Sequence, residues 1–230
     1  MRFYLGTPGS QLHAHLAQGC PVLVSYAASS KWLEESWMHS FTDGLLLDSG
    51  AYSVYASGVE VDLGAYVDWA AQFEWADAWA GLDHVAGDWR QSLENYKSGG
   101  FPTFHNSDPP ELLDELVPMA RERGGWIGVG LTTPRTGKRG WMRDTLERIP
   151  DDLHVHGWAC GLYADMRRLD SVDSTNWFRD VKYVLNSYPW LTPGECLEII
   201  VKRYQRNRRL RDVGGGQMEL TESYTQEDEK

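Results

Sequence analysis

The chain has 230 residues, of which 42% are hydrophobic and 24% charged, with a formal net charge of −11. This composition is typical of a globular protein, and its acidity disfavours broad, sequence-independent attraction to nucleic acid. No apolar leader and no run of about 18 apolar residues occurs, so we expect a cytoplasmic protein with no membrane contact. The three cysteines, Cys20, Cys160 and Cys196, are far apart, which disfavours a zinc knuckle or a dithiol redox pair.

Eight short apolar runs recur along the chain at intervals that helices can fill. They are residues 2–5, 21–26, 44–48, 79–85, 101–105, 126–131, 153–158 and 171–173. Strands that alternate with helices are typical of a parallel sheet, and eight such units predict an α/β fold, a compact (β/α)8 barrel of the TIM type. About 175 residues is short for this fold, which typically needs about 250. Some helices must therefore be short or missing, notably between Cys160 and Ser171.

Helices are predicted over residues 62–77, 108–124, 140–149, 176–187 and 193–211. The first is amphipathic, with apolar residues at three- and four-residue steps. In the second, Asp108 is the expected N-cap and Pro109 follows in the first turn. The last would be an extra helix after the barrel.

Charge is uneven near the C-terminus. Six cations lie between Lys202 and Arg211, and an acidic tail follows three glycines, Gly214 to Gly216. The cations form either a solvated helix face or a patch that contacts phosphates. We expect a single catalytic barrel domain over residues 1–212 and a flexible, disordered acidic tail over residues 213–230.

Acidic residues stand at the ends of three predicted strands: Asp48, Asp83 and Asp173. In a (β/α)8 barrel the active site lies at the carboxyl ends of the strands. Other polar residues and glycines fall at the same level, namely His105, Asn106, Gly128, Gly130 and His156. A single acid at such a place could be a helix N-cap, but three acids with two histidines favour a shared site.

In chain order, these strand ends resemble the motifs of the tRNA-guanine transglycosylase superfamily. Asp48-Ser49-Gly50-Ala51-Tyr52-Ser53 is similar to the family's Asp-Ser-Gly-Gly-Phe/Tyr-Gln motif. Gly81-Leu82-Asp83 stands where the family reads the base, and Ser171-Val172-Asp173-Ser174 resembles the strand of the nucleophilic aspartate. The family's glutamine, glycine-strand and Gly-Val-Gly positions fall at Phe104-His105-Asn106, Ile127–Leu131 and His156–Gly161.

The chain also differs from the family in ways that point to one branch of it. The family's Cys-x-Cys-x-x-Cys zinc site and its C-terminal RNA-binding domain are not recognisable in these 230 residues. In this the chain resembles the compact branch that includes phage DNA transglycosylases, which exchange guanine in DNA for a 7-deazaguanine. The resemblance therefore implies DNA as the polymer, with tRNA as the alternative, and a free base such as preQ0 or a relative. It also implies no metal, no other cofactor and, for a phage-encoded protein, the host cytoplasm.

The resemblance also implies a role for each residue. Asp173 is the expected nucleophile, Asp48 the general acid/base and Asp83 the reader of the base's N1–H and amine. Crowding carboxylates in a partly buried pocket is expected to raise the pKa of one of them. The rest of the base pocket would be formed by His105, Asn106, His156, the backbone of Gly128 and Gly130, and Tyr52, which would either stack on the base or pack in the core.

A base inside a duplex cannot reach such a pocket, so the target nucleotide must be flipped out or single-stranded. Cations near the barrel mouth would hold its phosphates. The candidates are Arg135, Lys138 and Arg139 after the sixth strand, and Arg206 and Arg209 in the C-terminal helix.

Other functions stay open. A metal-dependent hydrolase would use His154 and His156, which alternate on one face of a strand. A retaining glycosidase would take water as its acceptor. A non-catalytic nucleic-acid-binding barrel would keep the fold without the chemistry. The sequence leaves open which deazaguanine is used, the sequence context, the oligomeric state and whether an accessory protein opens the duplex.

Overall fold

The computed structural model describes residues 1–8, 16–28, 42–52, 60–84, 88–131, 138–160, 168–192 and 194–202. The strands are β1 (Arg2–Gly6), β2 (Cys20–Ser25), β3 (Thr42–Asp48), β4 (Ala78–Trp79), β5 (Thr103–His105), β6 (Trp126–Gly130), β7 (His154–Gly157) and β8 (Ser171–Ser174). The helices are the short η1 (Tyr26–Ala28), α4 (Leu63–Ala70), α5 (Trp89–Tyr96), α6 (Leu112–Glu122), α7 (Lys138–Arg148) and α8 (Trp177–Ser187). Residues 194–202 are also helical.

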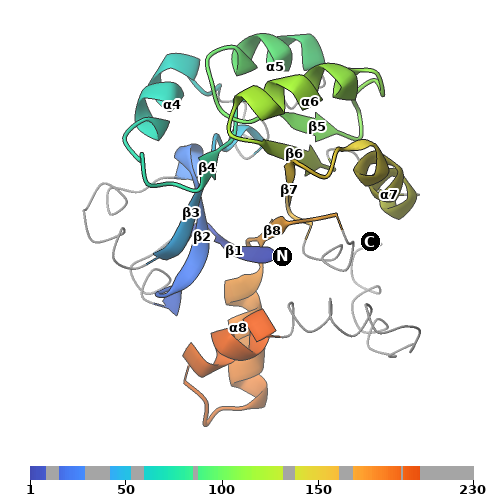
Figure 1. Cartoon of the computed structure of the whole chain (residues 1–230). Helices are drawn as coiled ribbons and strands as arrows, with labels where there is room; N and C mark the ends of the chain where they lie inside the picture. The colour runs from blue at the N-terminus through green and yellow to red at the C-terminus, as the bar shows by residue number, and fades with distance from the viewer. Residues whose placement is uncertain are drawn as a thin grey trace.

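All eight strands form one parallel sheet in the order β4-β3-β2-β1-β8-β7-β6-β5. The first strand pairs with the last, so Tyr4 lies opposite Asp173. The sheet curls about an axis, and Figure 1 views it nearly along that axis. The eight predicted strands and their parallel pairing are therefore confirmed, although β4 covers only Ala78–Trp79 where a strand over residues 79–85 was predicted.

The two edge strands, β4 and β5, do not share a ladder in the described part of the chain, so the sheet is a curled half-barrel. A single bridge between Ala80 and Phe101 joins the edges. Beside it the Gly81 N–H donates to the Phe101 carbonyl, and the Phe101 N–H donates to the Trp79 carbonyl, both at 2.9 Å. The two edges therefore approach within hydrogen-bonding distance at this one point.

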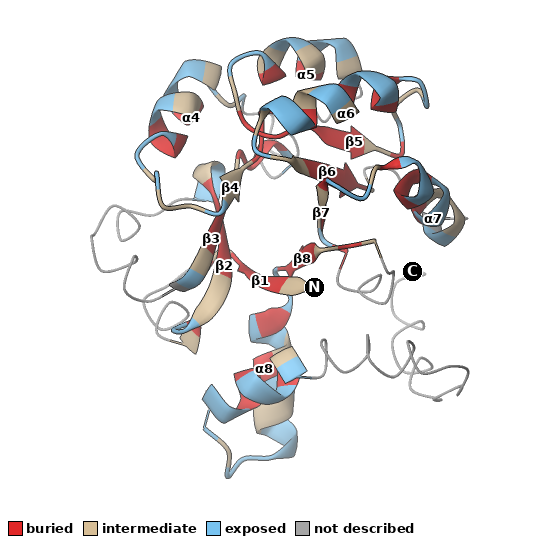
Figure 2. Ribbon diagram, in the orientation of Figure 1, coloured by how far each residue is buried: buried red, intermediate tan, exposed pale blue. Residues whose placement is uncertain are grey.

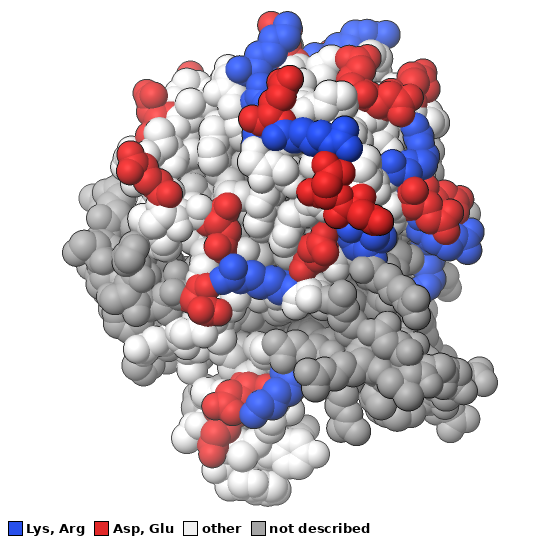
Figure 3. All heavy atoms as spheres, viewed as in Figure 1, with Lys and Arg blue, Asp and Glu red and all other residues white. Residues whose placement is uncertain are grey.

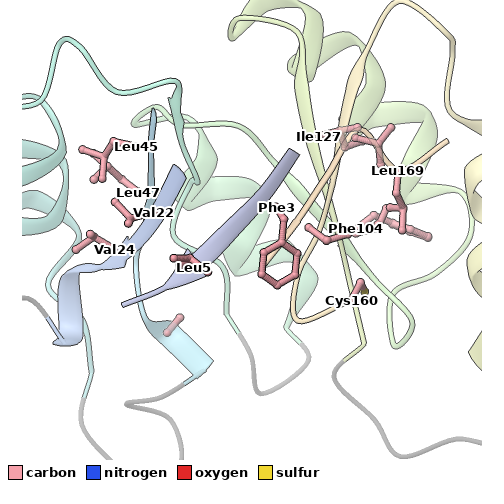
Figure 4. Close-up of a cluster of buried hydrophobic side chains, with 14 of the residues drawn as sticks. Phe3, Leu5, Val22, Val24, Leu45, Leu47, Phe104, Ile127, Cys160 and Leu169 are labelled. Carbon is pink, nitrogen blue, oxygen red and sulfur yellow. The ribbon is translucent and has the colours of Figure 1, made fainter. Parts of the chain in front are cut away.

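Side chains of the sheet divide between two cores because successive residues of a strand point to opposite faces. The larger core lies between the sheet and the helices, and its strand residues include Phe3, Leu5, Val22, Val24, Leu45 and Leu47 (Figure 4). Figure 2 shows buried residues concentrated on the strands and on the helix sides that face them. The smaller core fills the inside of the curl with Tyr4, Leu23, Leu46, Ala80 and Phe101.

The helices differ from their predicted bounds in ways that have local causes. Helix α4 begins after Asp62, whose carboxylate accepts a hydrogen bond from the Ala65 N–H at 2.7 Å, and it ends at Ala70 instead of residue 77. Helix α5 was not predicted. Asp88 caps it by accepting from the Arg90 and Gln91 N–H groups.

The prediction that Asp108 caps the next helix is wrong. Helix α6 begins at Leu112, after Glu111. The Asp108 carboxylate instead accepts a hydrogen bond from the His105 N–H at 2.7 Å, so it closes the turn that follows β5. A short aspartate side chain satisfies backbone N–H groups of turns as readily as those of helices.

Two predictions about the C-terminus fall partly beyond the described residues. The helix expected over residues 193–211 is helical over 194–202, and the acidic tail over 213–230 lies outside the described ranges. None of the helices in these ranges is long and apolar enough to cross a membrane.

Candidate active site

The structure brings the three predicted acids together at the carboxyl ends of the strands. Asp48 is the last residue of β3, Asp173 lies in β8 and Asp83 follows β4. Burial, then the negative charges of Asp83 and Asp173, raise the pKa of Asp48 to about 7, although a hydrogen bond from the Gly50 N–H opposes the shift. Asp48 can therefore both hold and release a proton near neutral pH.

His105 lies between two carboxylates. Its Nε2 is 3.0 Å from Asp83 Oδ2, and its Nδ1 is 3.6 Å from Asp108 Oδ2. Burial by itself lowers the pKa of His105, but hydrogen bonds and charges from Asp108 and Asp83 outweigh it and raise this pKa to about 9. At neutral pH the site therefore contains an imidazolium that compensates part of its negative charge.

The Asp173 carboxylate is held by the turn that follows β7. The Ala159 N–H donates to Asp173 Oδ1 at 2.7 Å, and His156 Nε2 lies 3.4 Å from the same oxygen. Burial and then the charge of Asp173 raise the pKa of the neighbouring Cys160 thiol to about 12. This thiol is therefore protonated at neutral pH and unsuited to act as a nucleophile.

Two glycines of β6, Gly128 and Gly130, leave room for side chains that pack against the strand at the site. A Cβ added to Gly130 would lie 2.8 Å from His105 Cδ2, so the glycine leaves room for the imidazole ring. A Cβ on Gly128 would collide with the indole of Trp158, which donates from Nε1 to Thr103 Oγ1 at 3.0 Å. The Gly128 N–H donates to the Pro102 carbonyl at 2.8 Å, and a backbone contact between this strand and a base stays a prediction.

The other predicted pocket residues differ in how far they are exposed to solvent. Tyr52 is 67% exposed, which excludes a core role and leaves its stacking role as a prediction. Asn106 is buried. His156 is fully buried below Asp173, with its ring edge against Trp158 at a centroid distance of 4.5 Å. A direct contact between His156 and a base stays a prediction.

The predicted phosphate contacts lie mostly outside the described residues. Arg135, Arg206 and Arg209 are beyond the described ranges, and so is the side chain of Lys138. Arg139 is exposed near the start of α7. On the face seen in Figure 3, acidic and basic side chains are interspersed.

Three contributors were missed by reasoning from the sequence: Asp108, Ala159 and Ser171. The signal for Asp108 was its position three residues after His105, a spacing that also suits a helix cap. Ala159 contributes its backbone N–H, and the amino-acid type at a position does not indicate such a contact. Ser171 shares a strand face with Asp173, and this alternation was the available clue.

The histidine pair of the metal hypothesis faces a hydroxyl group. His154 Nε2 is 2.8 Å and His156 Nδ1 is 2.9 Å from Ser171 Oγ. Across the described ranges, no three or more His, Cys, Asp or Glu side chains are grouped so that they could hold a metal ion.

Comparisons with protein-family models, with curated proteins and with solved structures gave no match.

Proposed function

We propose that this chain is a base-exchange transglycosylase that replaces guanine in DNA with a 7-deazaguanine derivative through a covalent aspartyl-glycosyl intermediate. The observation that carries the proposal is the convergence of Asp48, Asp83 and Asp173, with the pKa of Asp48 raised to about 7. The resemblance of the strand-end motifs to the tRNA-guanine transglycosylase superfamily supports it. We further infer that the curled sheet is the (β/α)8 barrel of that family, with its edges meeting at Ala80 and Phe101.

The first displacement forms the intermediate. An oxygen of Asp173 attacks the sugar C1′, and the C1′–N9 bond breaks with its electron pair on the departing guanine. Asp48 enters this step protonated and gives its proton to the guanine. A carboxyl group with a pKa near 7 suits this task, because a strong acid would already have lost the proton.

The second displacement reverses the roles. The incoming 7-deazaguanine gives its N9 proton to Asp48, and N9 attacks C1′ from the face that guanine left. The bond between C1′ and Asp173 breaks, and its electron pair returns to the carboxylate. Two inversions retain the configuration at C1′, as in retaining glycosidases. The reaction needs no oxidant, reductant or energy source, since one glycosidic bond replaces another.

Asp83 and His105 supply recognition in this proposal. A guanine-like ring offers N1–H and an exocyclic amine as adjacent donors, which a carboxylate accepts and which adenine lacks. His105 occupies one lone pair of Asp83 Oδ2, so the second lone pair of Oδ2 and the free Oδ1 accept the two donors of the base. The His105 imidazolium pairs with Asp83 and orients its carboxylate.

DNA is proposed as the polymer on the strength of the resemblance to the compact branch. The target nucleotide must leave the base stack to reach Asp173. Arg135, Lys138, Arg139, Arg206 and Arg209 remain the predicted phosphate contacts, and an accessory protein that opens the duplex remains a predicted partner.

The proposal is tested by incubating the protein with a labelled 7-deazaguanine and, separately, single-stranded DNA, duplex DNA and tRNA. We expect label in DNA, and none with Asp173→Asn or Asp48→Asn. Asp152→Asn is the matched control, because Asp152 is an exposed carboxylate whose partner is Arg121. Label in tRNA alone would overturn the choice of polymer. Release of guanine without incorporation would indicate a glycosidase, and incorporation by Asp173→Asn would overturn the assigned nucleophile.

A further inference from the structure

A chain of polar groups runs through the inside of the curled sheet to Asp173. His154 Nε2 contacts Ser171 Oγ at 2.8 Å, and Ser171 Oγ contacts His156 Nδ1 at 2.9 Å. The other nitrogen of His156 faces Asp173 Oδ1 at 3.4 Å. His156 and Ser171 are opposite residues of the β7–β8 pair, and both are fully buried. Parallel pairing therefore holds the groups of this chain in register.

The partners determine where the protons lie. If His156 Nε2 carried only a lone pair, that lone pair would lie 3.4 Å from a carboxylate oxygen, which is repulsive. A proton on Nε2 makes the contact favourable, and Nδ1 then accepts the Ser171 hydroxyl proton. Ser171 in turn accepts from His154 Nε2. Burial lowers the pKa of His154 to about 4, against the charge of Asp170, so this ring is neutral and able to donate once.

His156 Nε2 has no hydrogen-bond partner of normal geometry among the described residues. A buried donor without a partner costs free energy, so its presence at this place calls for an explanation. Catalytic hydrogen bonds are often long before substrate binds and shorten in the complex. The 3.4 Å separation from Asp173 Oδ1 fits a contact that tightens during the reaction.

A second donor reaches the same oxygen from a strained turn. Ala159 has a φ of 51°, the left-handed region that non-glycine residues rarely occupy, and it is the one such residue in the described part of the chain. In this conformation its N–H donates to Asp173 Oδ1 at 2.7 Å. The strained residue therefore holds the carboxylate that is the proposed nucleophile.

We propose that His156 and the Ala159 N–H form a two-donor clamp on Asp173 Oδ1, which leaves Oδ2 as the atom that attacks the sugar. The inference rests on the proposed function. On attack, Oδ2 bonds to C1′, the C1′–N9 pair leaves with guanine, and Oδ1 becomes the carbonyl oxygen of the ester. When the incoming N9 displaces Oδ2, the returning charge spreads onto Oδ1 and the clamp stabilises it. His156 is a positioning residue that acts through Asp173.

The clamp is first tested without any activity measurement. In protein labelled with ¹⁵N-histidine, NMR reports which ring nitrogen of His156 carries a proton, and the signal is assigned by its loss in His156→Gln. We expect a proton on Nε2 and a shift of that resonance in Asp173→Asn but not in Asp152→Asn. An unprotonated Nε2, or a His156 resonance that does not shift in Asp173→Asn, would overturn the clamp.

Kinetics then separate a clamp from a space-filling role. Glutamine can place its amide where His156 has Nε2, whereas asparagine reaches only the position of Nδ1. We expect His156→Gln to keep most of kcat, and His156→Asn and His156→Phe to lose roughly tenfold to a hundredfold in kcat, the loss expected for one hydrogen bond to a charged group. KM should change little in all three.

Folding is checked by the melting temperature and circular dichroism of each variant. Equal activity of the glutamine, asparagine and phenylalanine variants, all folded, would contradict the clamp while leaving base exchange intact. A wild type that shows the expected NMR state but exchanges no base would instead overturn the proposed function. The two failures are therefore distinguishable.

Discussion

His105 Nε2 lies 3.0 Å from Asp83 Oδ2, so the proposed base-reading carboxylate is paired with a cation before any base arrives. Asp108 holds the same imidazole from its other side. Asp48, Asp83 and Asp173 would otherwise place three carboxylates in one partly buried site with no compensating charge. The Asp108–His105–Asp83 group explains how the protein tolerates that arrangement and keeps Asp83 oriented.

The charge on His105 predicts a specific dependence of stability on pH. Its pKa is raised to about 9 in the folded protein, above the ordinary value for histidine, so the protonated ring stabilises the fold at pH values below about 6.5. This stabilisation is lost as the pH rises through 9. We expect the wild type to lose about 2–3 kcal/mol more unfolding free energy than His105→Gln between pH 6.5 and 9.5. Urea unfolding at several pH values measures the difference, and parallel curves would contradict the assignment.

A substitution of Asp48 is expected to increase the stability of the fold while abolishing activity. Its folded pKa of about 7 lies above the ordinary value of 3.8, so the fold favours the neutral acid and loses stability as the pH rises from about 4 to 7. Asp48→Asn cannot ionise. We expect it to exceed the wild type in unfolding free energy by about 2–4 kcal/mol at pH 8 and to show little difference at pH 4. If Asp48→Asn is less stable than the wild type at pH 8, the ionised Asp48 carboxylate does not destabilise the folded protein.

The same group predicts the pH dependence of the reaction. Asp48 must enter the first displacement protonated, so kcat/KM for DNA should fall above pH 7, approaching about tenfold per pH unit. Rates measured from pH 6 to 9 with the labelled base in excess test this, and the control is that the protein stays folded over the range. A rate that stays level to pH 9 would remove Asp48 from the role of general acid.

A substitution of Gly130 is expected to impair binding of the free base more than it impairs folding. A Cβ there would lie 2.8 Å from His105 Cδ2 and would push the ring from Asp83. We expect Gly130→Ala to raise KM for the free base by roughly tenfold, the effect of losing about one charged hydrogen bond, with a smaller change in kcat. Gly140→Ala is the matched control, because a Cβ at Gly140 meets nothing within 4 Å. Equal KM values for the two variants would argue against His105 in recognition.

The strands were predictable because each is a short apolar run that ends in small or polar residues. Helix α5 was not, since only Ser92 and Tyr96 of its eight residues are buried and its pattern is largely polar. Asp108 was assigned to the wrong element because an aspartate carboxylate accepts hydrogen bonds from backbone N–H groups both in turns and at helix N-termini.

The parts of the site that reasoning from the sequence could not supply depend on contacts between distant segments. The polar chain to Asp173 requires His156 to lie opposite Ser171, which only the register of β7 and β8 determines. The Ala159 contact requires a left-handed φ at a residue that rarely adopts one. Both are consequences of tertiary structure, and the alternation of Ser171 and Asp173 along β8 is the one local clue to them.

The central claim is that Asp173 becomes covalently bonded to the DNA sugar, and trapping that adduct tests it most directly. End-labelled DNA is mixed with the protein without a second base, denatured, and run on a gel, and the shifted band is digested for mass spectrometry. We expect an adduct in the wild type and Asp152→Asn, none in Asp173→Asn, and a modified peptide in which Asp173 carries the sugar. An adduct that persists in Asp173→Asn, or a modified peptide in which another residue carries the sugar, would contradict the claim.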